Sequence, residues 1–175
     1  LYGDFTNEMI IEASKRGKVA VDVQALLRHV NLEDHTMFFE DWKEKKEVLP
    51  YIEYLKTDAA EAEILTGLTD RYEAAKLLHT WGAKEVVITH NTEVIAYDGK
   101  EFCSCPIRAR NLSGRTGRGD TTFAAYMTER LHHSMKDSLL YATATVSNKM
   151  EIPGPYKGTR ADVDKYIEEF YSDIK

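Results

Sequence analysis

A basic, glycine-rich segment, "SGRTGRGDTT", is the part of this sequence best suited to chemistry. It runs from Ser113 to Thr122 and places three glycines within six positions, followed by Asp120. Glycine loses more backbone freedom on folding than any other residue, so clustered glycines indicate that another group approaches the backbone closely. Downstream, Phe123, Met127 and Leu131 recur at every fourth residue, which predicts a helix that begins at Asp120.

The start of such a helix is suited to bind an anion, because unpaired N–H groups and the positive end of the helix dipole meet there. The charges agree with this, since the chain has a net charge of -6 and yet every charged residue from position 107 to 119 is positive: Arg108, Arg110, Arg115 and Arg118. A Walker phosphate loop is excluded, because Asp120 and not lysine follows Gly119. The alternative is an ordinary turn in which Asp120 only caps the helix.

The elements around this segment alternate between strand and helix. The periodicities predict a helix that ends at Gly17, a strand over 18–23, a charged helix broken near Pro50, a strand near Tyr51–Leu55, helices over 58–67 and 70–82, and a strand over 84–90. This alternation is typical of a parallel sheet with right-handed crossovers. Further along, "TEVIAYDGKEFCSCPI" predicts a hairpin around Asp98-Gly99.

Three helices are expected to close the chain, from Asp120 to about His133, from Lys136 to about Met150 and from Arg160 to about Tyr171. The predicted fold class is therefore α/β, a parallel sheet flanked by helices with an antiparallel hairpin edge. Residues 1–175 are expected to form a single domain. Because the chain begins with Leu1 and not methionine, we expect it to be part of a longer protein.

Composition excludes several functional classes. No apolar stretch approaches the roughly 20 residues of a membrane helix, so no membrane partner is expected. The acidic net charge argues against nucleic-acid binding through a general basic face. Cys103 and Cys105 lie two apart on one predicted strand, where they are poorly placed to bridge each other. We expect reduced thiols and a cytoplasmic location.

Three segments in order resemble the ribokinase-like (PfkB) carbohydrate and nucleoside kinases. "RTGRGDTTFAAY" is similar to the family signature D-T-x-G-A-G-D, and "LKTDAAEAEILTG" is similar to K-x-N-x-x-E-A-x-x-L-T-G. "AKEVVITHNTEVIAYDG" resembles the strand and hairpin that border the nucleotide in the family. The resemblance covers nearly the whole chain and implies a ribokinase-like fold from which the amino-terminal part and lid are missing.

The resemblance also implies roles for single residues. Asp120 would be the catalytic base, and the backbone of Gly117, Arg118 and Gly119 would form the anion hole for the transferred phosphoryl group. Thr89 and Thr116 would lie beside ATP. Phosphoryl transfer depends on positioning and charge neutralisation, which suits these residue types.

The implied metal is Mg²⁺, bound through water by Glu61 and by Asp58, where the family usually has asparagine. Two carboxylates one helical turn apart suit a cation that prefers oxygen ligands and keeps its waters. The alternative for this pair is a capping box at the start of a helix. Gly114 replaces an aspartate that helps to hold a monovalent cation in the family, and Arg118 replaces alanine. A monovalent cation is therefore doubtful, and Arg118 is a candidate substitute for it.

The sequence thus predicts an ATP-dependent phosphotransferase that acts on a hydroxyl of a sugar or nucleoside. The alternative function is a non-catalytic module of the same fold that binds a nucleotide or phosphometabolite. The complete protein could form a homodimer. The 175-residue chain alone could be inactive, because the part of the family that contacts the acceptor is missing from it.

Overall fold

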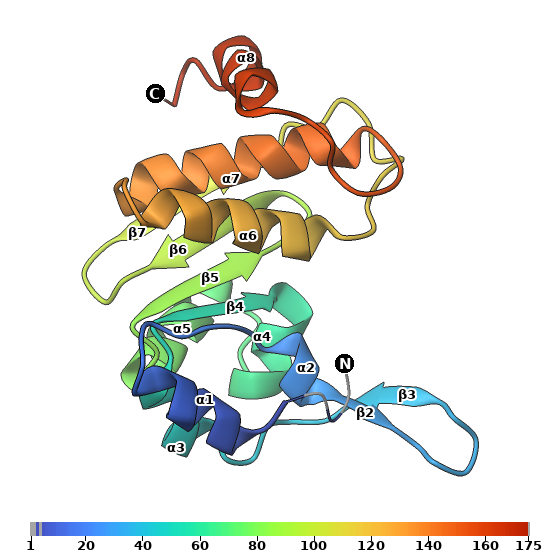
Figure 1. Cartoon of the computed structure of the whole chain (residues 1–175), viewed down its shortest axis with the longest axis vertical. Coiled ribbons are helices and arrows are strands. Elements are labelled where there is room, and N and C mark those ends of the chain that lie inside the picture. Colours follow the sequence, from blue (N-terminus) through green and yellow to red (C-terminus); the bar gives the residue numbers. More distant parts are fainter. Residues whose placement is uncertain (1–2, 4, 175) are drawn as a thin grey trace. The chain divides into compact units, whose positions relative to one another are not determined.

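The computed structural model describes residue 3 and residues 5–174, so Leu1, on which the expectation of a longer protein rests, lies outside the described residues (Figure 1). The fold is α/β, as the sequence predicts. The chain forms two compact units. Unit 1 contains the residues up to Thr89 together with Ala96–Phe102, and unit 2 contains His90–Ile95 and the residues from Cys103 onward. A single domain over residues 1–175 stays a prediction.

Parallel strands form the centre of unit 1. They are neighbours in the order β1 (Ala20–Asp22), β4 (Tyr54–Asp58) and β5 (Glu85–Thr89). All of β5 and the first four residues of β4 are buried, as expected for strands of a parallel sheet. Helices α4 (Ala59–Thr66) and α5 (Arg71–Thr80) form the crossover between β4 and β5, as predicted.

Two details of unit 1 differ from the sequence prediction. The charged helix before Pro50 is only the short α3 (Lys45–Val48), and a 3-10 turn over Leu49–Tyr51 follows it. Proline has no N–H and is accepted only in the first turn of a helix, so Pro50 opens this turn and ends the α-helix. Strand β4 consequently begins at Tyr54, three residues later than predicted.

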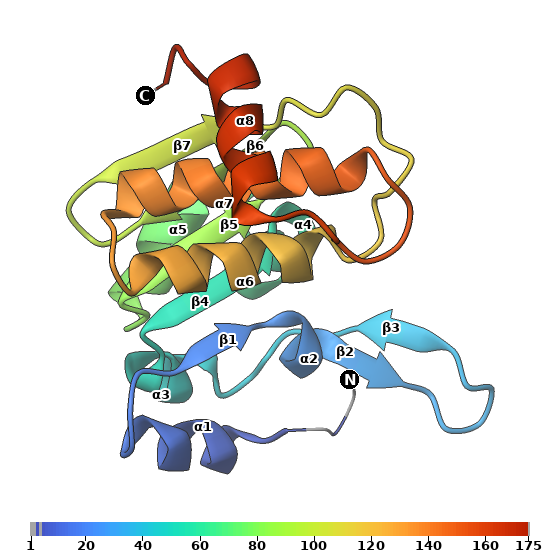
Figure 2. The ribbon, with the colours of Figure 1, turned by 45° about the horizontal axis from the view of Figure 1, so that its top comes forward.

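The segment after β1 is not a simple loop. It contains α2 (Gln24–Leu27) and an antiparallel hairpin of β2 (Arg28–Val30) and β3 (Met37–Phe39), which Figure 2 shows extending away from α1 (Asn7–Ser14). All three residues of β3 are exposed. Such short strands lack the alternation of buried and exposed residues by which a strand is recognised in a sequence.

The predicted hairpin is present as β6 (Glu93–Tyr97) and β7 (Phe102–Pro106), which are neighbours in the sheet. In the turn between them, Gly99 has a φ of 90°. The Asp98 carboxylate there accepts hydrogen bonds from the N–H groups of Lys100 and Glu101. Both cysteines lie on β7, as expected, and they do not form a disulfide with each other.

Unit 2 is built around three helices: α6 (Arg118–Arg130), α7 (Met135–Met150) and α8 (Arg160–Phe170). Figures 1 and 2 show α6 and α7 side by side, and α7 is the most buried helix of the unit. Among the described residues no helix is both long and apolar enough to cross a membrane. The candidate site lies at the start of α6, which follows the loop 107–117, and at the end of α7, which precedes the loop 151–159.

Candidate functional site

Helix α6 begins two residues earlier than predicted. Its N-cap is Gly117, which has a φ of 78° in the left-handed region that favours glycine, and no side chain caps the helix. Asp120 is therefore the third residue of the helix. The alternative that Asp120 only serves as an N-cap is wrong.

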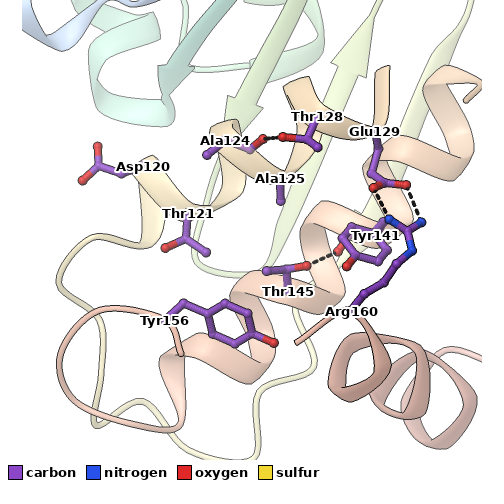
Figure 3. A pocket seen from close by; sticks show the side chains of 10 residues that line it. All are labelled: Asp120, Thr121, Ala124, Ala125, Thr128, Glu129, Tyr141, Thr145, Tyr156 and Arg160. Carbon is purple, nitrogen blue, oxygen red and sulfur yellow. Dashed lines mark hydrogen bonds and ion pairs between the residues drawn. The ribbon is translucent and has the colours of Figure 1, made fainter. Parts of the chain in front are cut away.

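The Asp120 side chain is exposed, and its carboxylate accepts no hydrogen bond from the part of the chain that the structure describes. It lies at one end of a pocket of about 520 Å³ along α6 and α7. Figure 3 shows the far end of this pocket closed by Arg160, which donates to both Glu129 oxygens at 2.7 and 2.9 Å. An unpartnered carboxylate at the mouth of a pocket is free to accept a proton from a bound molecule.

The backbone beside Asp120 offers N–H groups to an anion. Within the described residues, the N–H groups of Gly117 and Gly119 have no acceptor, whereas that of Arg118 donates to the Arg115 carbonyl at 3.2 Å. Thr116 is exposed and directly precedes this turn. Two of the three predicted anion-hole groups are thus open, at the positive end of a thirteen-residue helix.

The four arginines of the basic segment divide into two pairs. Arg108 makes a bidentate ion pair with Asp173, and Arg110 pairs with Glu151, with 2.8 Å between Nε and Oε2. These two arginines fasten the loop to the end of the chain and to the end of α7, and their charges are neutralised. They are not part of an anion site.

Arg115 and Arg118 remain beside the helix start. Both guanidinium groups donate to the Asn91 Oδ1 atom, and the distance from Arg115 is 3.0 Å. Neither forms an ion pair with a described carboxylate, so their positive charges stay available to an anion. The sequence alone does not indicate Asn91 or Lys149, whose ammonium binds two carbonyls of the same loop. Nothing in the local sequence marks either residue, because the contacts span 24 to 35 positions.

Unit 1 brings together the other predicted residues. Asp58 and Glu61 form the capping box of α4: Asp58 Oδ1 accepts the Glu61 N–H at 2.9 Å, and Glu61 Oε2 accepts the Asp58 N–H at 2.8 Å. Thr89 pairs with Asp58 in the parallel register of β4 and β5 and is buried. The carboxyl ends of neighbouring parallel strands are where open α/β sheets bind ligands.

The environment of Glu61 determines what its carboxylate can bind. Burial raises the pKa of Glu61, although the Lys56 ammonium opposes this shift. Its second oxygen accepts from Gln24 Nε2 at 3.0 Å. Of the four carboxylate oxygens of Asp58 and Glu61, only Asp58 Oδ2 accepts nothing from the described residues. A shared contact through water fits this pair better than direct ligation, and no group of three candidate metal ligands occurs among the described residues.

A second pocket in unit 2 measures about 320 Å³ and lies beside the end of α7. Its walls are largely apolar and come from α7 and the "IPGPYKG" loop, with Ile152, Pro153, Pro155 and Tyr156 among them. Tyr156 lines both pockets. Largely apolar walls of this kind suit an aromatic ring.

Three comparisons relate the chain to known proteins. The model of the family "pfkB family carbohydrate kinase" matches residues 17–159. A cytidine kinase from Thermococcus kodakarensis is 36% identical over 85 residues, which are 47% of this chain and 31% of the kinase.

Solved structures agree with this match. A pyrophosphate-dependent myo-inositol-1 kinase converted into a myo-inositol-3 kinase is 33% identical, with a TM-score of 0.86 over 97% of this chain and 60% of the other. The ribokinase of Arabidopsis thaliana, complexed with ribose and ATP, is 21% identical, with a TM-score of 0.78 over 96% of this chain and 55% of the other, and shows the fold alone. The chain thus spans at most 60% of the length of these relatives.

The glycine-rich loop, the start of α6 and the capped α4 all lie within the matched residues 17–159, in the α/β fold of the similar structures. The chain belongs to the pfkB family of carbohydrate kinases.

Proposed function

We propose that the protein transfers a phosphoryl group from ATP to a hydroxyl of a sugar or nucleoside. The observation that carries this proposal is the exposed, unpartnered Asp120 carboxylate beside open N–H groups at the start of α6. Membership of the pfkB family supports it, as does the similarity to a cytidine kinase and to an inositol kinase.

In the proposed reaction, the Asp120 carboxylate accepts the proton of the acceptor hydroxyl as its oxygen bonds to the phosphorus. The bond from phosphorus to the leaving phosphate oxygen breaks, and the electron pair stays on that oxygen. The backbone N–H groups of Gly117, Arg118 and Gly119 stabilise the transferred group, for which the Arg118 N–H must turn away from Arg115. Fixed donors of this kind contribute most where charge develops in the transition state.

Asp58 and Glu61 would hold Mg²⁺ through water, and the open Asp58 Oδ2 atom supports this. When bound, the metal neutralises charge on the donor phosphates. Thr89, beside Asp58 in the register, and Thr116, next to Gly117, would contact the nucleotide.

Replacing Glu61 by glutamine is expected to raise the Mg²⁺ concentration needed for half-maximal activity, because one negative oxygen near the metal is lost. Both Glu61 oxygens accept hydrogen bonds, one from the Asp58 N–H and one from Gln24, and glutamine has a single acceptor oxygen. One of the two contacts is therefore lost, and the melting temperature should fall. Titration of Mg²⁺ and thermal melting measure the two effects. The exposed Glu63 on the same helix provides the control Glu63→Gln, which should change neither. A lower melting temperature with an unchanged Mg²⁺ curve would leave Glu61 only its capping role.

Two donors are compatible with the anion-binding loop. ATP is favoured by the apolar pocket of about 320 Å³, whose walls would hold the base. Pyrophosphate is the second candidate, because solved structures 33–34% identical to this chain are of pyrophosphate-dependent kinases.

Substitution of Tyr156 by alanine separates these donors. If ATP places its base against this ring, the KM for ATP should rise by about tenfold, on the scale of one lost base–aromatic stack. The KM for pyrophosphate should stay within about twofold, since pyrophosphate has no base. Steady-state kinetics with each donor give the answer. Equal KM values for ATP in the wild type and the variant would exclude binding of the base in this pocket.

The test of the proposed function is acceptor-dependent turnover by the complete protein. The protein is incubated with Mg²⁺, either donor and a panel of sugars and nucleosides, and release of ADP or phosphate is followed. Turnover that depends on one class of acceptor is expected. Saturable donor binding without turnover on any acceptor would instead support the non-catalytic module.

A further inference from the structure

Lys149 is a buried lysine whose partners are backbone carbonyls. The residue is only 2% exposed, and its ammonium donates to the carbonyls of Gly114, at 2.5 Å, and Thr116. It forms no ion pair with any described residue. Lysine is almost never fully buried without a carboxylate partner, so a buried ammonium held by carbonyl groups alone indicates a specific role for the charge.

The contact of Lys149 is not that of an ordinary helix-end lysine. A lysine in the last turn of a helix usually interacts with the last carbonyls of its own helix. The Lys149 ammonium instead leaves α7 and binds carbonyls 33 and 35 positions earlier in the chain. Those carbonyls belong to the loop that leads into the N-cap of α6.

The same loop is packed tightly against the end of α7. The Gly114 N–H donates to the Met150 carbonyl at 2.7 Å, and the Ser113 hydroxyl donates to the Glu151 carbonyl at 2.7 Å. A Cβ atom at Gly114 would lie 2.0 Å from the Ile152 carbonyl oxygen, so no other residue fits there without displacing the backbone. The loop that Lys149 contacts is therefore held against the end of α7 by hydrogen bonds and by close packing.

The geometry of the peptide bond links Lys149 to the anion hole. The Thr116 carbonyl and the Gly117 N–H belong to one planar trans peptide, in which they point in opposite directions. By holding the carbonyl toward the interior, the ammonium turns the Gly117 N–H toward the outer face of the loop. That N–H has no acceptor among the described residues, and it is one of the groups offered to an anion.

We propose that Lys149 is a built-in cation that positions the anion-binding loop 114–117. Its ammonium fixes the Gly114 and Thr116 carbonyls, orients the Gly117 N–H and keeps a positive charge beneath the phosphoryl group. The loop then needs no cation from solution. This inference rests on the proposed function for the role of the bound anion, but the cation site itself does not depend on it.

The experiment compares a variant that removes most of the Lys149 side chain with a variant that keeps a side chain of similar length but no charge. Lys149→Ala leaves room for a small cation, Lys149→Met fills the room without charge, and Lys136→Ala removes an exposed lysine of the same helix as a control. Melting temperature and affinity for pyrophosphate are measured for each protein at equal ionic strength. Each is compared in N-methylglucamine, potassium and ammonium chloride.

The wild type and Lys136→Ala should behave alike in all three salts. In N-methylglucamine, Lys149→Ala and Lys149→Met should bind pyrophosphate about 10- to 100-fold more weakly, as expected for lost hydrogen bonds from a charged group. Potassium or ammonium should restore the affinity and melting temperature of Lys149→Ala and leave Lys149→Met unchanged. A purely structural lysine would give no such selective rescue.

The proposal is overturned if Lys149→Ala binds pyrophosphate as the wild type does, or if small cations fail to restore it more than Lys149→Met. If Lys149→Ala is unfolded in N-methylglucamine, its melting transition in ammonium decides: a recovered transition supports the proposal and its absence overturns it. If the wild type does not bind pyrophosphate at all, the proposed anion site is contradicted. The melting temperatures then decide the cation site alone.

Discussion

Replacing Asp120 by asparagine is expected to lower kcat by about 10²- to 10⁴-fold, the typical contribution of a general base. The substitution keeps the size of the side chain and removes its capacity to take a proton. Because Asp120 caps nothing and accepts no hydrogen bond from described residues, the fold should not change. Affinity for the donor should stay within a few-fold, since the N–H groups proposed to bind it belong to the backbone.

The matched control for this variant is Asp164→Asn, at an exposed aspartate of α8 that lines no pocket described above. It should leave kcat and the melting temperature unchanged. Measurement of kcat, donor affinity and melting temperature for both variants separates catalysis from binding and stability. An Asp120→Asn protein that keeps more than about a tenth of kcat would exclude Asp120 as the base.

Substitution of Gly114 by alanine is expected to displace the loop 114–117, the proposed anion site. The new Cβ atom would lie 2.0 Å from the Ile152 oxygen and 2.5 Å from its carbonyl carbon, and backbone atoms cannot rotate out of the way. The loop must shift, so the free energy of unfolding should fall by about 1–3 kcal/mol, the usual cost of overpacking. Affinity for pyrophosphate should fall as well, since the Lys149 contacts move with the loop.

Gly17→Ala is the control for this substitution, because a Cβ atom at Gly17 meets nothing within 4 Å. Chemical denaturation and pyrophosphate titration of both variants measure the two effects. A Gly114→Ala protein as stable as Gly17→Ala would contradict the tight packing between the loop and α7.

The elements that could be predicted from the sequence are those fixed by local chemistry. Asp58 and Glu61 predict a capping box, and Gly67 ends the same helix in the left-handed conformation. Asp98-Gly99 predicts a turn, and the carboxylate and the positive φ of that turn are as the residue types require. In each case the decisive contacts lie within a few residues.

The features that were missed depend on distant contacts or on competing local signals. The apolar periodicity predicts that α6 starts at Asp120, whereas Gly117 begins the helix two residues earlier through its left-handed backbone conformation. Arg108 and Arg110 looked like anion-binding residues in the sequence, but Asp173 and Glu151 neutralise them. The role of Lys149 follows only from the loop that folds against it.

The central claim is that the start of α6 binds a phosphoryl group through its backbone, and nuclear magnetic resonance of the ¹⁵N-labelled chain tests this most directly. Backbone amide signals are followed during titration with pyrophosphate. The signals of Gly117, Gly119 and Asp120 should move saturably with one dissociation constant, and that of Gly17 should not move. Saturable binding that shifts other amides and leaves the signals of Gly117, Gly119 and Asp120 in place would contradict the account.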